Sequence, residues 1–181
     1  MRVVAGTAGG LRIAAPSGQA TRPTSDRVRE ATFNALGSMG VIEDAEVADL
    51  FAGSGAMGIE ALSRGAAHVT FVDDDRRARR AIEANLVTTK LADRALVVGD
   101  DVLQFLELTE RHFDLAVLDP PYAYDAWAEV LSTLDAEMAV LESDRPIDPG
   151  AGWAVVRTRA YGTTVVTICR RSVSDPQESP T

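Results

Sequence analysis

The stretch Asp49-Leu50-Phe51-Ala52-Gly53-Ser54-Gly55-Ala56-Met57-Gly58 ends an apolar run and begins a helical pattern. Its glycines have the spacing G-x-G-x-x-G, which between a strand and a helix is typical of a site for a nucleotide-containing cofactor. The same spacing also occurs in a tight strand-to-helix turn that binds nothing. The stretch therefore predicts the first strand–helix unit of an α/β fold, and neighbouring residues must decide whether it holds a ligand.

Apolar runs alternate with helical patterns from residue 46 onward. The expected strands are 47–51, 69–72, 95–98, 115–118 and 138–141. Such alternation predicts a parallel sheet that is covered by helices on both faces. The last two apolar runs, 153–159 and 163–170, are too close together for a helical crossover, so we expect them to pair antiparallel.

The first 40 residues follow a different pattern. The runs 2–5 and 10–13 predict a small β-hairpin, and Ser25-Asp26 precedes a helical pattern that Gly37 and Gly40 end. We therefore expect an N-terminal hairpin and helix extension over 1–40, an α/β domain over 41–171 and a disordered tail over 172–181.

Composition excludes several classes of protein. The chain has 181 residues, of which 46% are apolar, and no run is long enough for a signal core or a membrane span. One cysteine, Cys169, and two histidines leave no material for a disulfide or a zinc site. We expect a cytoplasmic protein without a metal ion, acting as a monomer. The net charge of −9 argues at first sight against nucleic-acid binding.

Acidic residues end the expected strands. Asp49 follows the first strand and Asp73 the second, about 20 residues after Gly53, where an acid can bind ribose hydroxyls. Asp49 would repel a dinucleotide pyrophosphate but attract the ammonium and sulfonium groups of S-adenosylmethionine. Asp100 and Asp101 are alternatives for the contact with adenine. The expected cofactor-binding residues are Asp49, Ala52, Gly53, Ser54, Gly55, Asp73, Asp74, Asp101 and Val102.

The tetrapeptide Asp119-Pro120-Pro121-Tyr122 directly follows the strand 115–118. Two prolines can simply end a strand as a stiff loop. They can also hold the Asp119 carboxylate and the Pro120 carbonyl rigid, so that each accepts one N–H of an exocyclic amine and directs its lone pair toward a methyl donor. Tyr122 would then stack on the target base. The tetrapeptide predicts methyl transfer to an amino group.

The glycine loop, Asp73 and Asp119-Pro120-Pro121-Tyr122 together resemble the class I S-adenosylmethionine-dependent N-methyltransferases. The stretch Arg22-Pro23-Thr24-Ser25-Asp26-Arg27-Val28-Arg29-Glu30 resembles the signature of the bacterial small-subunit (16S) rRNA (guanine-N2)-methyltransferases of the RsmD type. This resemblance extends over roughly residues 1–171. It implies a Rossmann-like, seven-stranded class I methyltransferase sheet with an antiparallel last strand, S-adenosyl-L-methionine as cofactor and the small ribosomal subunit as partner.

Basic residues are concentrated at the N-terminus. Residues 1–30 carry a net charge of +3, contributed by Arg2, Arg12, Arg22, Arg27 and Arg29 against Asp26 and Glu30. Such arginines can form a solvated face or contact RNA phosphates, and the resemblance favours RNA. The distribution of charge therefore predicts an acidic cofactor cleft beside a basic RNA-binding arm.

Three other functions remain open on the sequence. The same tetrapeptide serves methyl transfer to adenine N6 in DNA or RNA, or to a protein glutamine, although the chain has no separate target-recognition domain for DNA. The G-x-G-x-x-G spacing also suits an NAD-dependent oxidoreductase. A non-enzymatic RNA-binding module would bind RNA without transferring a methyl group.

Overall fold

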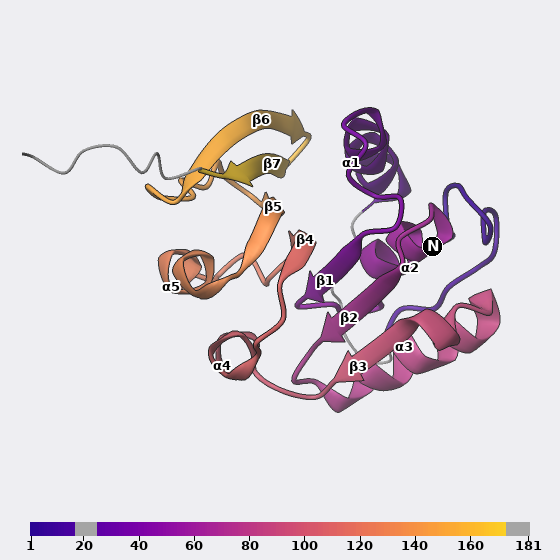
Figure 1. Cartoon of the computed structure of the whole chain (residues 1–181). Helices are drawn as coiled ribbons and strands as arrows, with labels where there is room; N and C mark the ends of the chain where they lie inside the picture. Colours follow the sequence, from indigo (N-terminus) through magenta and orange to yellow (C-terminus); the bar gives the residue numbers. More distant parts are fainter. Residues whose placement is uncertain (17–24, 173–181) are drawn as a thin grey trace, which may run out of the picture.

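The computed structural model describes residues 1–16 and 25–172, which form a seven-stranded sheet with helices on both faces (Figure 1). The strand order is β3-β2-β1-β4-β5-β7-β6. The strands are β1 (Glu46–Leu50), β2 (His68–Val72), β3 (Ala95–Val98), β4 (Phe113–Leu118), β5 (Ala136–Ser143), β6 (Trp153–Tyr161) and β7 (Thr164–Arg171). Strands β1 to β5 are parallel, and β7 runs antiparallel to β5 and β6. The predicted fold class is confirmed.

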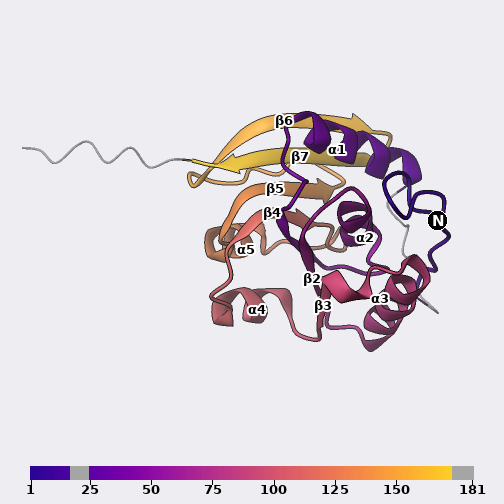
Figure 2. The same ribbon diagram turned by 45° about the vertical axis from the view of Figure 1, so that its right-hand side comes forward.

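Five α-helices of the described chain cover the two faces of the sheet (Figures 1 and 2). They are α1 (Asp26–Ser38), α2 (Ala56–Ser63) and α3 (Arg76–Thr89) on one face, and α4 (Val102–Leu108) and α5 (Trp127–Thr133) on the other; a 3-10 turn, η1 (Ala92–Arg94), precedes β3. Each face has its own hydrophobic core, one around Phe33, Ile59 and Phe71 and the other around Phe113 and Leu131. The central strands read as continuous apolar runs because both of their faces are buried.

The third glycine of the loop sets how closely α2 approaches the sheet. A Cβ atom on Gly58 would lie 2.3 Å from the ring of Phe71 in β2. Gly55 precedes α2 with φ of +74°, in the left-handed region that glycine adopts without strain. The glycine spacing is therefore required by the turn and the helix packing, independently of any ligand.

The predicted N-terminal hairpin is reduced to one isolated antiparallel bridge, between Arg2 and Arg12. Beyond this bridge the segment packs on α2, because the backbone N–H groups of Val4 and Ala5 donate to the carboxylate of Glu60 in α2, at 2.7 and 3.1 Å. Residues 1–13 thereby cover α2, all of whose residues are buried. The predicted helix is confirmed as α1, whose first turn is capped by Ser25. The boundary at residue 40 stays a prediction.

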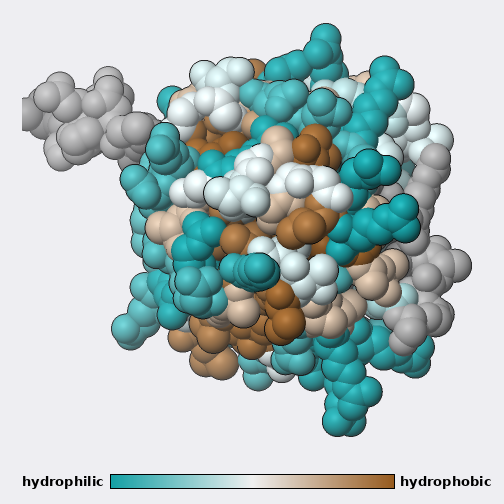
Figure 3. Space-filling model, turned by 90° about the vertical axis from the view of Figure 1, so that its right-hand side faces the viewer, coloured by the Kyte–Doolittle hydropathy of each residue, from teal (hydrophilic) through white to brown (hydrophobic). Residues whose placement is uncertain are grey.

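The surface of the described chain adds two findings. No helix within residues 1–16 and 25–172 is long and apolar enough to cross a membrane. Figure 3 shows one side of the molecule, where exposed hydrophobic atoms form small patches separated by hydrophilic ones. The predicted tail, apart from Ser172, and Arg22 lie outside the described residues.

Candidate cofactor and catalytic site

A cavity of about 710 Å³ lies at the carboxyl ends of the parallel strands, where ligands of such sheets bind. It is lined by residues from the loops after β1, β2, β3 and β4. The sequence-predicted residues among them are Asp49, Ala52, Gly53, Ser54, Asp73, Asp74, Asp101, Val102, Asp119, Pro120, Pro121 and Tyr122. The fold therefore brings the predicted cofactor residues and the Asp119–Tyr122 tetrapeptide into one cavity.

Two carboxylates hold the glycine loop in place. The N–H of Gly58 donates to Asp49 Oδ2 at 2.8 Å, and the N–H of Gly53 donates to Asp73 Oδ2 at 2.7 Å. The other oxygen of Asp73 accepts from the N–H of Asp75 at 2.9 Å. Asp49 and Asp73 therefore fix the backbone that faces the cavity as well as lining it.

The electrostatics of the cavity favour a cationic ligand. Burial raises the pKa of Asp49 well above its ordinary value, an effect that the Gly58 N–H partly offsets and that nearby Asp119 and Asp73 strengthen. Burial also raises the pKa of Asp73, the N–H groups of Gly53 and Asp75 offset part of this, and the adjacent acids add to it. A cation placed among these groups would lower both pKa values.

Two of the predicted cofactor residues, Asp101 and Gly55, lie at the starts of helices α4 and α2. Of Asp100 and Asp101, Asp101 lines the cavity, and its carboxylate also caps α4 by accepting from the N–H groups of Leu103 and Gln104 at 2.9 and 3.1 Å. Gly55 is absent from the described residues that line the cavity. Its left-handed backbone starts α2, so its part in the site is to shape the turn.

The tetrapeptide lies next to the glycine loop. The N–H of Asp119 approaches the carbonyl of Leu50 at 3.5 Å, and the N–H of Tyr124 donates to the carbonyl of Pro121 at 2.8 Å. Pro120 is buried, whereas the side chain of Tyr122 is 41% exposed. Pro120 is thus packed on the protein, whereas Pro121 and Tyr122 are exposed.

Several lining residues carried no clear sequence signal. Phe51 has φ of +60°, which is uncommon for a bulky residue, and its ring packs edge-on against Tyr124 at 4.9 Å. Met1 reaches the cavity from the N-terminal segment, where its sulfur lies 3.5 Å from Ser54 Oγ. Glu142, near the end of β5, also lines the cavity. It could have been predicted from the sequence, because it follows the expected strand 138–141 as other acidic residues follow the earlier strands.

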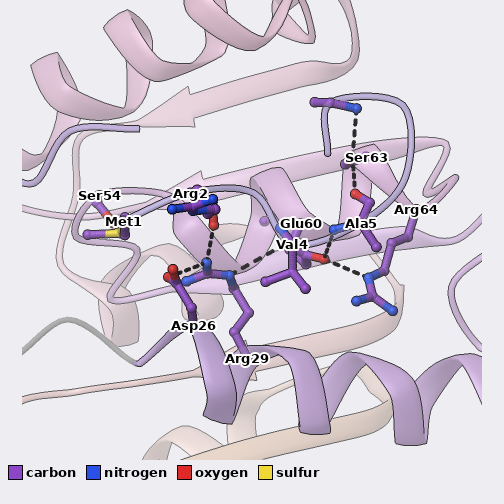
Figure 4. A network of polar contacts seen from close by, with 12 residues as sticks. Met1, Arg2, Val4, Ala5, Asp26, Arg29, Ser54, Glu60, Ser63 and Arg64 are labelled. Atoms are coloured by element: carbon purple, nitrogen blue, oxygen red, sulfur yellow. Dashed lines mark hydrogen bonds and ion pairs between the residues drawn. The ribbon is translucent and has the colours of Figure 1, made fainter. Parts of the chain in front are cut away.

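The predicted RNA-binding arginines fall into three groups. Arg2, Arg12 and Arg27 are exposed, and Arg22 lies outside the described residues. The prediction for Arg29 is wrong, because its side chain is fully buried. Its Nη2 donates to Asp26 at 2.9 Å and to the carbonyl of Arg2, and its Nε lies 3.5 Å from Glu60 (Figure 4). Arg29 joins α1 to the N-terminal segment and α2.

Comparison with known proteins agrees with this geometry. The family described as Conserved hypothetical protein 95 matches residues 1–170. Ribosomal RNA small subunit methyltransferase D of Escherichia coli (strain K12) is 32% identical over 189 residues, covering 99% of this chain and 94% of the relative. The protein of that name from Haemophilus influenzae is 34% identical over 174 residues, covering 90% and 89%.

Solved structures show the same sheet over nearly the whole chain. The Escherichia coli protein yhhF is 32% identical and superposes with a TM-score of 0.84, covering 96% of this chain and 99% of that one. A hypothetical protein of Thermus thermophilus is 30% identical, with a TM-score of 0.80 and coverage of 93% and 98%. The chain therefore belongs to the Conserved hypothetical protein 95 family, the family of the RsmD-type small-subunit rRNA methyltransferases.

Proposed function

We propose that this protein is an enzyme that transfers a methyl group from S-adenosylmethionine to the exocyclic N2 of a guanine in 16S rRNA. The observation that carries the proposal is the single cavity that joins a cluster of carboxylates to the tetrapeptide Asp119-Pro120-Pro121-Tyr122. The names of the relatives support ribosomal RNA of the small subunit as the substrate. The proposed enzyme acts as a monomer in the cytoplasm.

The cavity suits the size and charge of the proposed cofactor. Its volume of about 710 Å³ is in the range of small-molecule sites. Seven acidic residues line it, and no lysine or arginine is among the described lining residues. A pyrophosphate would be repelled there, whereas an ammonium and a sulfonium would be attracted, which disfavours NAD as the ligand. When bound, S-adenosylmethionine supplies an electrophilic methyl group.

The residues of the tetrapeptide account for activation of a weakly nucleophilic amine. The Asp119 carboxylate and the Pro120 carbonyl each accept one N–H of the guanine amine, which turns the nitrogen lone pair out of the ring plane. The prolines hold both acceptors in position, so that orientation is provided before the reaction. Tyr122, with its exposed ring, stacks on the guanine. The nitrogen then loses a proton to Asp119 or to solvent.

The direct test is incubation of the purified protein with labelled S-adenosylmethionine and small ribosomal subunits that lack the modification. We expect label on N2 of one guanine of 16S rRNA. The variant Asp119→Ala should bind the cofactor but transfer no label, whereas Asp93→Ala, which removes an exposed acid outside the cavity lining, should behave as wild type.

Other outcomes identify the competing functions. Label on adenine N6 or on a protein glutamine would refute the guanine assignment. Tight binding of NAD without binding of S-adenosylmethionine would indicate an oxidoreductase. RNA binding that survives Asp119→Ala, with no methyl transfer by the wild-type protein, would indicate an RNA-binding module.

A further inference from the structure

The β6–β7 hairpin concentrates positive charge in an acidic protein. Residues 153–171 contain four arginines and no aspartate or glutamate, although the whole chain has a net charge of −9. The arginines are Arg157, Arg159, Arg170 and Arg171. Arg171 is engaged within the fold, since its guanidinium lies 4.2 Å from the ring centroid of Trp153. The other three need a separate explanation.

These three arginines lie on one face of the hairpin. An irregularity between Val155 and Arg157 changes the register of β6, after which Arg157 pairs with Ile168 and Arg159 with Val166. Ile168 and Val166 belong to the core on the α1 side of the sheet, and Arg170 shares their face because strand residues alternate. The hairpin therefore presents a stripe of arginines toward the side where α1 packs.

A shallow groove separates α1 from β6. It is lined by Ala31, Thr32 and Ala35 of α1 and by Arg157, Arg159 and Tyr161 of β6, together with Val166 and Ile168. Figure 2 shows α1 running alongside the hairpin. Arg27 lies four residues before Ala31 and therefore on the same side of the helix. We call this surface, with Arg27, Arg157, Arg159 and Arg170, the α1–β6 groove.

One end of the α1–β6 groove is at the catalytic edge of the sheet. Val165 of β7 pairs with Ser143, the last residue of β5, and with Ala160 of β6. The tip of the hairpin, next to Arg159 and Tyr161, thus lies at the edge where the parallel strands end and the cavity opens. Arg170 pairs with Met138 and marks the far end of the groove.

The arginines of the α1–β6 groove are available for a ligand. In the described part of the chain, no carboxylate is within ion-pair distance of Arg27, Arg157, Arg159 or Arg170. RNA phosphates gain affinity from such side chains and would be repelled by the seven acids of the cavity. An RNA whose base enters this cavity must gain its affinity from basic surfaces at the rim.

We propose that the α1–β6 groove binds the phosphate backbone of the rRNA segment that presents the target guanine. This inference rests on the proposed function, and it adds Arg157, Arg159 and Arg170 to the predicted RNA-binding surface while Arg29 leaves it. The groove runs from the catalytic edge along the sheet, so phosphates flanking the guanine lie along it. The contacts fix the position of the RNA and do not read its sequence.

The test compares two double variants that change the net charge equally. Arg157→Glu/Arg159→Glu alters the α1–β6 groove, and Arg80→Glu/Arg111→Glu alters two exposed arginines in α3 and in the segment before β4. For the groove variant we expect the KM for subunit RNA to rise about tenfold or more, and the salt slope of RNA binding to fall by about 2. The kcat at saturating RNA and the Kd for S-adenosylmethionine should be unchanged, and the control should raise the KM less than about twofold.

Urea denaturation verifies that both double variants fold. The single substitution Arg27→Glu, on the α1 side of the groove, should also raise the KM for subunit RNA. Equal effects of the two double variants, or none from the groove variant, would overturn the proposal. A wild-type dimer that the groove variant dissociates without losing RNA affinity would overturn it too, because the exposed edge of β6 would then bind a second copy. If the wild-type protein binds RNA through these arginines but methylates nothing, the proposed function fails and this inference stands.

Discussion

Arg27 and Arg29 are two residues apart in α1, and we predict opposite consequences for the same substitution. Arg29→Met should lower the free energy of unfolding by about 3 kcal/mol, because it removes a buried charge from an ion pair. Arg27→Met should change it by less than about 0.5 kcal/mol, because the side chain meets solvent. The RNA affinity should respond the other way, weakened by Arg27→Met and unchanged by Arg29→Met.

The size of the effect follows from the partners of the pair. The side chains of Arg29 and Glu60 are both fully buried, with Nε and Oε2 3.5 Å apart. Removing one partner of a buried pair costs about 3–5 kcal/mol. Arg29→Met belongs at the lower end, because Glu60 keeps the N–H groups of Val4 and Ala5 and Arg64 Nε at 2.7 Å.

Glu60→Met belongs at the upper end of the same range. It removes the acceptor of those two N–H groups and leaves Arg29 buried beside an apolar side chain. Since Arg29 and Glu60 are in contact, the double variant should cost less than the sum of the two single variants.

The assay is urea denaturation of the four variants and the wild-type protein, with thermal melts in parallel. For a chain of this size, about 3 kcal/mol corresponds to a Tm lower by about 6–12 °C. The reasoning would be refuted if Arg29→Met and Arg27→Met were equally stable, or if Glu60→Met were milder than Arg29→Met. RNA binding by each folded variant completes the comparison.

Three further predictions concern the loop and the cavity. Gly58→Ala should destabilise the protein by about 1–3 kcal/mol in urea denaturation, because the added Cβ would lie 2.3 Å from Phe71; a loss below about 0.5 kcal/mol would contradict the packing. Asn85→Asp should raise the Kd for S-adenosylmethionine about tenfold and leave kcat within about twofold of the wild-type value. The reason is that Asn85 Nδ2 donates hydrogen bonds to the carbonyls of Ala14 and Ser54 at the cavity wall, each at 2.9 Å, which the variant loses. Calorimetry checks this, with Thr88→Ala on the same helix as the control. Because the pKa values of Asp49 and Asp73 are raised in the folded protein, protonation of these two carboxyl groups favours the folded state. This contribution to stability is complete below the ordinary pKa of 3.8 and is lost as the pH rises through the raised values. Over the same interval the affinity for the cationic cofactor should increase, and Asp49→Asn should flatten that increase in calorimetric titrations.

The positions of the strands in the α/β domain and the location of the cavity could be predicted from local patterns. The seven apolar runs expected after residue 46 are all strands, whereas the runs 2–5 and 10–13 form only one isolated bridge. The central strands are recognisable because a strand buried on both faces is a short, continuous apolar segment. Asp49, Asp73, Asp101 and Asp119 are far apart in the chain yet line one cavity, since parallel strands bring their carboxyl ends to one edge. The site follows from the topology once the sheet is recognised.

The surroundings of individual side chains could not be predicted in this way. Phe51 adopts a left-handed backbone because the turn after β1 requires it, and nothing in its residue type indicates this. The N-terminal hairpin is limited to one bridge, and the N–H groups of Val4 and Ala5 donate instead to a carboxylate of α2. In each case the deciding group comes from elsewhere in the chain.

The arginines show most clearly which properties follow from the sequence and which depend on the tertiary structure. Local composition is enough to establish that this acidic protein carries positive charge at its N-terminus and in its last hairpin, and acids at the ends of its strands. Which arginines meet solvent depends on how the helices pack, because Arg27 and Arg29 are about 200° apart around α1. Arg27 is exposed one turn before Ala31, which lines the groove beside β6, and Arg29 is buried against Glu60, a partner 31 positions away along the chain. A charge pattern gives the number of cations, whereas the packing of the helices determines which of them are exposed to solvent.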